Sequence, residues 1–296
     1  METTLLEAFS QTKLSVASQK QHAKKISQWM EYSNHSIDEL LDNPERSLEI
    51  LSSNPTIKQT ATNRHVFISA MMAYITHVIP QNEERVSELT KKWKEVQKEN
   101  WEPLSEHYSK NEPTENQKEK VMPFNEIVKI RESLESGSFE RLLLSFYTMM
   151  EPIRADYYST EIIHEGQESK EENYLVLGVK EAYIVIRDFK TKNKHTVIEN
   201  KLPEELVSEL HMSLTQYPRS YLFVSDDKKT PFTRKLFSNW ACRTLTRVLK
   251  QPMTLTVLRH LYISEKIKEK TPLDELKQIA KKIEHSRDMQ RVYDWS

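Results

Sequence analysis

Five side chains in the second half of the chain have the types that cleavage of a phosphate ester requires. They are two arginines, a lysine, a histidine and a tyrosine: Arg154, Lys190, Arg259, His285 and Tyr293. A tyrosine oxygen can attack phosphorus and hold the product covalently, while arginines offer forked, permanently charged donors to phosphate oxygens. Lysine can protonate the leaving oxygen, and histidine can donate to a phosphate oxygen or tune the tyrosine. Because these groups can do the charge work of a metal ion, we expect no metal and no cofactor.

Each of these residues also has an ordinary structural interpretation. Tyr293 could be a half-buried aromatic that anchors a terminal helix, and His285 could cap the helix before it. Lys190 lies in a lysine-rich turn, in which Lys192 is an alternative acid. Arg259 lies in an apolar helical segment, and a buried arginine demands an anionic partner, either a carboxylate or a phosphate.

Three further residues could be confused with site residues. Tyr221 and Tyr262 are alternative tyrosines, but each lies in an apolar segment and is expected in the core. Asp156 follows Arg154 by two residues, so it is either an orienting carboxylate or a simple loop acid.

The first third of the chain is expected to be helical. Apolar residues recur at helical spacing in segments 15–32, 36–53, 56–78 and 82–101. Segment 36–53 begins with Ser36 as a cap and has Glu39 at the capping-box position. Residues 107–120 have almost no apolar side chains and contain a proline, so they predict a linker. We therefore expect a helical domain over 1–116 and a second domain over 117–296.

The second domain is expected to be mainly α-helical with a small antiparallel three-stranded sheet. Helical patterns cover 123–136, 138–152, 203–217, 233–250, 254–268 and 272–286, and β-rich runs cover 173–179, 182–189 and 195–202. These elements put Arg154 just after a helix, Lys190 in the turn between the second and third strands, and Arg259 inside a helix.

Composition limits the class of protein. The chain has 296 residues, of which 37% are hydrophobic and 29% charged, so it fits a soluble protein of two domains. Its one cysteine, Cys242, leaves no internal disulfide or cysteine-rich zinc site and favours a reducing compartment. No run of eighteen apolar residues and no signal-peptide profile is present, so we expect an intracellular protein without a membrane span. Three glycines leave no glycine-rich phosphate loop.

The order of the candidate residues resembles a known family. "EPIRADYY" carries Arg154, "IRDFKTKNKHTV" carries Lys190, "TLTVLRHLYIS" carries Arg259, and "EHSRDMQRVYDW" carries His285 and Tyr293. This series resembles the catalytic domain of the tyrosine recombinases, the phage-type integrases. "PIRADYY", "FKTK" and "LRHLYIS" are most similar to the versions from large DNA viruses and their virophages. The resemblance covers residues 117–296, whereas residues 1–116 share only the helical layout of the family's core-binding domain.

The resemblance implies a site-specific DNA recombinase or integrase that cleaves and rejoins DNA through a covalent 3′-phosphotyrosine on Tyr293. It implies double-stranded DNA as the partner and a homo-tetramer on DNA, with a monomer or dimer when free. A viral protein of this kind would act in the host cytoplasm or nucleus. The alternatives are a type IB topoisomerase, which uses the same chemistry on one duplex, and a DNA-binding relative with weakened catalysis.

Two positions depart from the family pattern. Thr256 stands where the family has a histidine one helical turn before Arg259, and a threonine hydroxyl donates to phosphate but accepts protons poorly. His260 is not expected to replace that histidine, because adjacent helix positions point about 100° apart. Glu284 stands where the family has a glycine. We expect a reduced rate or an altered pH dependence of cleavage.

The C-terminal stretch has the positive charge that a polyanion site needs, but charge alone favours a run of ordinary solvated helix faces. Net charge is −1 overall, but residues 228–296 carry 16 basic and 7 acidic side chains, a net of +9. In the first domain, basic and polar residues around two helices could contact phosphates or base edges, or could be ordinary exposed residues. These candidates are Lys24, Lys25, Lys58, Gln59 and Arg64.

Overall fold

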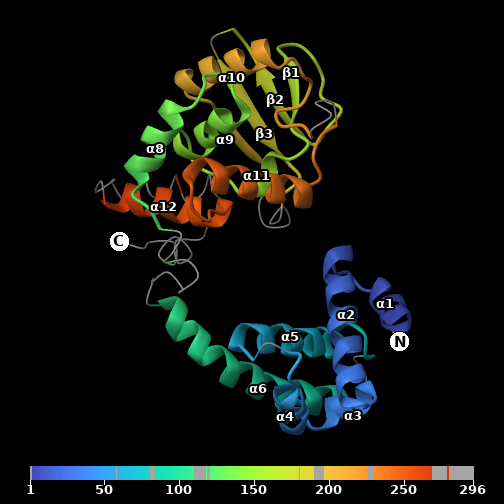
Figure 1. Ribbon diagram of the computed structural model, residues 1–296. Helices are drawn as coiled ribbons and strands as arrows, with labels where there is room; N and C mark the ends of the chain where they lie inside the picture. Colours follow the sequence, from blue (N-terminus) through green and yellow to red (C-terminus); the bar gives the residue numbers. More distant parts are fainter. Residues whose placement is uncertain are drawn as a thin grey trace. The chain divides into compact units, whose positions relative to one another are not determined.

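The computed structural model describes residues 2–57, 59–80, 84–109, 118, 121–179, 181–189, 197–225, 230–268 and 279 (Figure 1). The chain forms two compact units, residues 1–110 and 111–296. The boundary expected near residue 116 falls just inside the second unit, and residues 110–117 lie outside the described part of the chain.

The described residues of the first unit form helices joined by short turns, and two tryptophans lie at its centre. Trp29 is fully buried, with its ring 5.7 Å from that of Phe67 and 5.8 Å from that of Trp93, both edge-on. The Trp93 indole N–H donates to the Leu41 carbonyl at 3.0 Å, so this buried polar atom has a hydrogen-bond partner. The helices are α1 Glu2–Ser10, α2 Val16–Ser33, α3 Ile37–Asp42, α4 Pro44–Ser53, α5 Ala61–His77 and α6 Glu84–Ser109.

Local signals placed most of these helices. The predicted capping box is confirmed, because Ser36 accepts from the Glu39 amide and the Glu39 carboxylate accepts from Ser36. Segment 36–53 is two helices, because Asn43 ends α3 and caps α4, with Pro44 at its first position, where the missing N–H costs nothing. Helix α1 was not predicted, and α6 runs through Pro103 to Ser109, beyond the expected end at residue 101.

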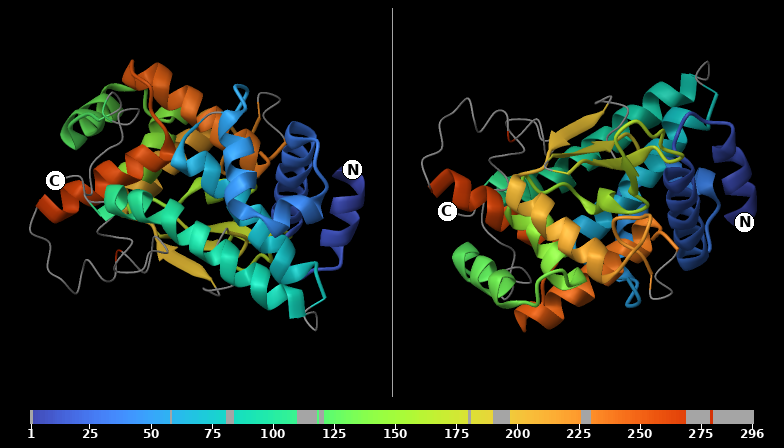
Figure 2. Two further views of the ribbon diagram at one scale, coloured as in Figure 1. Left: turned by 90° about the horizontal axis from the view of Figure 1, so that it is seen from below. Right: turned by 90° about the horizontal axis from the view of Figure 1, so that it is seen from above.

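Helix α9 is the centre of the second unit. Every residue from Leu142 to Tyr147 is buried, and α9 contacts α8, α10, α11 and α12 (Figures 1 and 2). The confirmed expectation is a mainly helical fold, and each helical segment predicted within the described residues is present. The helices are α8 Phe124–Ser133, α9 Phe139–Thr148, α10 Glu204–Gln216, α11 Arg234–Leu249 and α12 Leu255–Lys268.

The sheet has four strands and is mixed, which corrects the expected three-stranded antiparallel sheet. Strands β2 Asn173–Leu177, β3 Ala182–Ile186 and β4 Ile198–Lys201 are the predicted antiparallel set. The additional strand, β1 Glu161–His164, pairs in parallel with β2 at the edge. Sequence reasoning missed β1 because it has only four residues and polar ends, and its pairing with β2 and with residues 220–222 is non-local.

One face of the sheet packs on the helices and the other is open. Leu175, Ile184 and Ile198 are buried in the same core as α9, whereas Tyr183 and Glu199 are exposed. This alternation follows from the two-residue period of a strand. The open face has a hollow of about 580 Å³ whose rim includes Glu165, Glu181 and Glu199. The negative charge of these carboxylates disfavours binding of a polyanion there.

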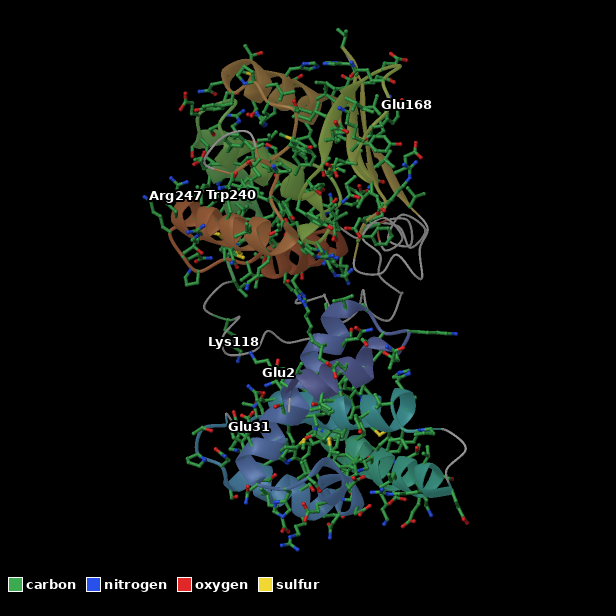
Figure 3. All side chains as sticks on the ribbon, turned by 90° about the vertical axis from the view of Figure 1, so that its right-hand side faces the viewer. Glu2, Glu31, Lys118, Glu168, Trp240 and Arg247 are labelled. Carbon is green, nitrogen blue, oxygen red and sulfur yellow. The ribbon has the colours of Figure 1, made fainter. Side chains whose placement is uncertain are left out.

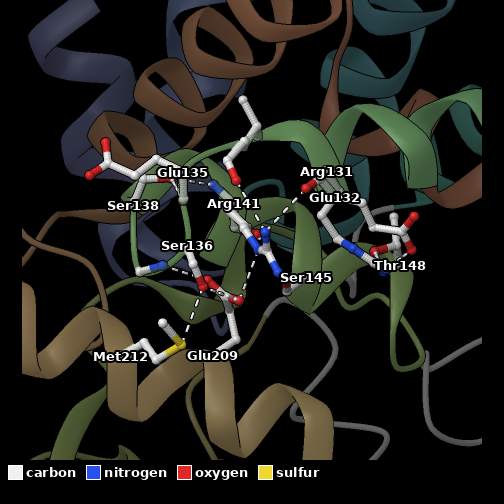
Figure 4. Close-up of polar contacts among 12 residues, drawn as sticks. Arg131, Glu132, Glu135, Ser136, Ser138, Arg141, Ser145, Thr148, Glu209 and Met212 are labelled. Carbon is white, nitrogen blue, oxygen red and sulfur yellow. Dashed lines mark hydrogen bonds and ion pairs between the residues drawn. The ribbon is translucent and has the colours of Figure 1, made fainter.

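Glu209 ties α10 to α9 through an ion pair with Arg141, and to the loop between α8 and α9 through the Gly137 amide (Figure 4). The Glu209 carboxylate accepts from the Arg141 Nε at 2.9 Å and from the Gly137 amide at 2.7 Å. Gly137 has φ +81°, and a Cβ there would lie 3.0 Å from the Met212 carbonyl oxygen and 2.7 Å from the Gln216 amide oxygen. Glycine is therefore required at this turn.

Helix α11 has one buried and one exposed face (Figure 3). Trp240 packs with its ring 5.5 Å from Phe223 and 5.3 Å from Phe232. Arg247 is on the exposed face and pairs with Glu140 at 2.6 Å.

Among the helices that the structure describes, none is long and apolar enough to cross a membrane.

Candidate active site

The loop that follows α9 holds the first candidate residue. Pro152 cannot continue the helix, and the chain passes through Arg154 into the short 3-10 helix η1 Ala155–Tyr157. The Tyr147 hydroxyl, in the last turn of α9, donates to the Arg154 carbonyl at 2.8 Å. The Arg154 side chain is half-buried. We call residues 152–158 the Arg154 loop.

Arg259 lies against the Arg154 loop. Its side chain is 1% exposed, and its Nε donates to the Pro152 carbonyl at 3.0 Å. These two residues are 107 positions apart, so the folded chain brings α12 to the loop of the other candidate arginine. Helix α12 is fixed at its start because the Thr254 hydroxyl accepts from the Val257 amide at 3.2 Å. Thr256, one turn before Arg259, is exposed.

A buried carboxylate ties the Arg154 loop to α11. Asp156 is fully buried, and the Arg234 guanidinium lies 2.6 Å from its Oδ1. Arg234 is the first residue of α11, a position at which a cation is unfavourable because of the helix dipole. The ion pair with Asp156 explains why an arginine is nevertheless found there. An arginine at a helix start was the sequence signal that could have identified this contact. It was missed because its partner lies on a distant segment.

Three tyrosines in or beside the Arg154 loop, of which Tyr147 and Tyr157 are buried and Tyr158 is half-buried, have raised pKa values. Burial raises the pKa of Tyr147 well above its usual value, with Arg259 lowering it and Asp156 raising it further. Burial likewise raises the pKa of Tyr157. For Tyr158, burial and a hydrogen bond to the Asp188 carboxylate both raise the pKa. A phenol with a raised pKa is a poor nucleophile, so these three tyrosines are not favoured for attack.

Tyr262 and Tyr221, the two alternatives to Tyr293 as the nucleophile, differ in their burial. Tyr262 is 5% exposed and packs edge-on to Phe124 at 5.8 Å, which confirms the expectation of a core residue. Tyr221 is half-buried at the sheet edge and donates to the Glu171 carboxylate at 3.2 Å, so its expected core position was wrong. Tyr221 forms an isolated antiparallel bridge with Glu161 of β1, which holds it at the sheet edge instead of in the core.

The remaining candidates of the catalytic set lie outside the described residues. Lys190, His285 and Tyr293, with the alternative acid Lys192 and the departure at Glu284, stay predictions from the sequence. Arg154 and Arg259 are the two members whose surroundings are known. In the described part of the chain, no group of three or more His, Cys, Asp or Glu residues could hold a metal ion.

The candidate DNA contacts of the first unit have mixed surroundings. Lys24 is exposed, whereas the Lys25 ammonium lies 4.5 Å from the centre of the Phe67 ring, and burial followed by Lys24 lowers its pKa. The Gln59 amide donates to the Leu51, Asn54 and Ile57 carbonyls, which occupies the group expected to read a base. Arg64 is half-buried and Lys58 lies outside the described residues, so all five stay predictions.

Helix α11 offers a larger basic face than the one predicted in the first unit. It contains no acidic residue, and its exposed side chains recur at helical spacing. Positive charge on an exposed helix face attracts phosphate backbones, although Arg247 of this face is already paired with Glu140 of α9. The exposed basic residues of this face, which include the residue after the helix, are Lys235, Arg243, Arg247 and Lys250.

Comparisons with known proteins give distant structural likenesses and no family. No protein-family model matches the chain. No curated protein sequence matches it. Among solved structures, the chain is similar to a XerA recombinase with a TM-score of 0.42 and 14% sequence identity, over 99% of this chain and 92% of that chain. A TM-score below 0.5 at this identity assigns no family, so the function has to be argued from the chain's own residues.

Proposed function

We propose that this protein is a site-specific DNA recombinase that cleaves and rejoins DNA through a tyrosine. The Tyr293 oxygen attacks phosphorus, the bond between phosphorus and the 5′ oxygen breaks, and the 3′-phosphate remains on the tyrosine. The phenol proton leaves to His285 or to water, and Lys190 gives a proton to the 5′ oxygen. Rejoining is the reverse, and the energy of the broken bond is kept in the phosphotyrosine, so no nucleotide is consumed.

The contact between Arg259 and the Pro152 carbonyl is the observation that carries this proposal. It joins α12 to the Arg154 loop, so two arginines that the sequence singled out for phosphate binding belong to one neighbourhood. Attack on a phosphodiester adds a negative charge at phosphorus, and preorganised cations stabilise that charge most in a water-poor site. The Arg259 Nε donates to the Pro152 carbonyl in this buried neighbourhood, so its guanidinium is held in a fixed position.

The basic face of α11 supports DNA as the substrate. Its exposed lysines and arginines belong to the same unit as both candidate arginines, and Arg234 at its start is paired with Asp156 of the Arg154 loop. Binding led by phosphate contacts weakens steeply with salt, because each neutralised phosphate releases counterions. We expect the affinity for duplex DNA to fall by orders of magnitude between low and physiological salt.

A covalent trapping experiment tests the proposal. The full chain is incubated with short duplexes that carry a nick and randomised flanking sequence, so that the released fragment diffuses away and the adduct accumulates. We expect a protein–DNA adduct that Tyr293→Phe abolishes. Tyr221→Phe is the matched control, because it removes a phenol that bonds only the Glu171 carboxylate in the described structure.

Each of the other outcomes of this experiment supports a different function for the protein. A mobility shift with no adduct marks a DNA-binding protein without catalysis, for which the exposed Thr256 in place of the family histidine is the supporting observation. Relaxation of supercoiled plasmid by monomeric protein, with no preferred sequence among trapped duplexes, marks a type IB topoisomerase. An adduct that persists in Tyr293→Phe refutes the assignment of the nucleophile.

A further inference from the structure

One buried amide connects the Arg154 loop to the end of β3. Asn173, the first residue of β2, is 2% exposed. Its side-chain N–H groups donate to the carbonyls of Asp156 at 3.2 Å and Asp188 at 3.1 Å. Its side-chain oxygen accepts from the amides of Arg187 at 2.9 Å and Asp188 at 2.8 Å. The whole hydrogen-bonding capacity of this amide is therefore spent on two stretches of backbone.

These two stretches carry different parts of the proposed chemistry. The Asp156 carbonyl belongs to the Arg154 loop, and residues 187–188 form the exit of β3, which we call the β3 exit. In the sequence the β3 exit leads through the buried Phe189 directly to Lys190. The hydrogen bond from Tyr158 to the Asp188 carboxylate joins the same two stretches a second time.

The β3 exit depends on Asn173 more than the Arg154 loop does. Three of the four Asn173 bonds go to residues 187–188. The Arg154 loop receives one, and it is also held by Tyr147, by Arg259 and by the Arg234 ion pair. Loss of the amide should thus loosen the β3 exit, which Tyr158 still holds through the Asp188 carboxylate, while the arginine side of the site stays in place.

We infer that Asn173 is a positioning residue of the phosphodiester site, which fixes the β3 exit against the Arg154 loop so that leaving-group protonation is aligned with phosphate binding. This inference rests on the proposed function. It gives Asn173 a role that differs from general stabilisation of the sheet, because its loss should affect one chemical step. A purely structural asparagine would affect binding and every step alike.

The test separates that step by changing the leaving atom. In a duplex whose 5′-bridging oxygen is sulfur, the leaving thiol has a pKa of about 8.5 and departs without a general acid. Trapping rates are measured for the oxygen and sulfur duplexes with Asn173→Asp, which removes both donors, and with Asn173→Ser. The ratio of the two rates within one preparation cancels any loss of folded protein.

The control variant is Asn200→Ser. Asn200 is also a buried asparagine of this sheet, 6% exposed on β4 and opposite Ile184, but its amide nitrogen has no hydrogen-bond partner among the described residues. It therefore tests the loss of a buried asparagine without any bond to the Arg154 loop. Lys190→Ala and Arg259→Ala supply the reference ratios for a lost acid and a lost phosphate contact.

We expect Asn173→Asp and Asn173→Ser to cleave the oxygen duplex at least about tenfold more slowly than the wild type, and the sulfur duplex within about threefold, as Lys190→Ala does. Asn200→Ser should keep the wild-type ratio. Equal slowing on both duplexes, as in Arg259→Ala, or wild-type rates on the oxygen duplex would overturn the role of Asn173 alone. A wild-type protein that traps neither duplex would overturn the proposed function, and this inference with it.

Discussion

Replacing Arg259 by alanine removes the most buried cation of the proposed site. The side chain is 1% exposed and its Nε donates to the Pro152 carbonyl, so the variant loses one charge-assisted hydrogen bond and leaves a carbonyl without that donor. A hydrogen bond to a charged group is worth about 1.5–3 kcal/mol. We expect the free energy of unfolding to fall by more than that amount, because truncation of a large buried side chain also leaves a cavity.

The effect on cleavage should be larger and separate from stability. Removing one preorganised donor to a developing negative charge costs about 10²–10³-fold in rate, or about 2.7–4 kcal/mol. DNA affinity should change little, because a buried guanidinium contributes less to encounter than the exposed basic face of α11. The signature of the site is thus a large loss of cleavage with nearly unchanged binding.

Arg219→Ala is the control, because it removes a half-buried arginine that also donates to backbone carbonyls. Arg219 stacks 4.5 Å from the Phe139 ring and donates to the Ser213, Tyr217 and Leu222 carbonyls, and burial lowers its pKa to about 10. Both variants are compared with the wild type by trapping on nicked DNA at a fixed interval below each melting temperature. If Arg259→Ala forms adduct as fast as Arg219→Ala, Arg259 does not belong to the site.

Three further measurements test the site, the first-unit core and its histidines. Thr256→His should leave cleavage unchanged or raise it, because the exposed position one turn before Arg259 can present an imidazole to a phosphate; a sharp loss in the trapping rate would contradict this. Trp29→Ala should lower the free energy of unfolding in urea by about 3–5 kcal/mol, since the indole is fully buried against two aromatic rings. Burial, followed by the charge of His77, lowers the pKa of His22, so the unfolded chain binds that proton more readily and stability is lost as pH falls through the folded pKa. Urea midpoints between about pH 8 and about pH 5 should therefore decrease less in His22→Leu than in the wild type; parallel decreases would refute the contribution of His22.

Local signals in the sequence determined the helical elements. The apolar stripe that includes Trp29 and the stripe that includes Trp93 predicted α2 and α6, and both residues are fully buried. The Ser36 and Glu39 pair predicted a capping box that is present. Such features depend on residues within one or two turns of each other, so an amphipathic period or a cap can be read without knowing the rest of the fold.

Contacts between distant segments decided the sheet and the surroundings of the site. Strand β1 exists because β2 and residues 220–222 pair with its edges, although its own four residues carry little β signal. The sequence indicated that a buried Arg259 needs a partner, yet only the fold shows that its Nε donates a hydrogen bond to the Pro152 carbonyl.

The sequence by itself determined which residue types are available for phosphate chemistry and, for Arg154 and Arg259, on which elements they lie. Only the tertiary structure decided that Arg234 pairs with Asp156 and that Asn173 bonds two separate stretches of backbone. The physical reason is that a hydrogen bond or ion pair is formed within about 3 Å, whatever the separation along the chain. A single sequence records neighbours along the chain, and the packing of α9, α11, α12 and the sheet sets neighbours in space.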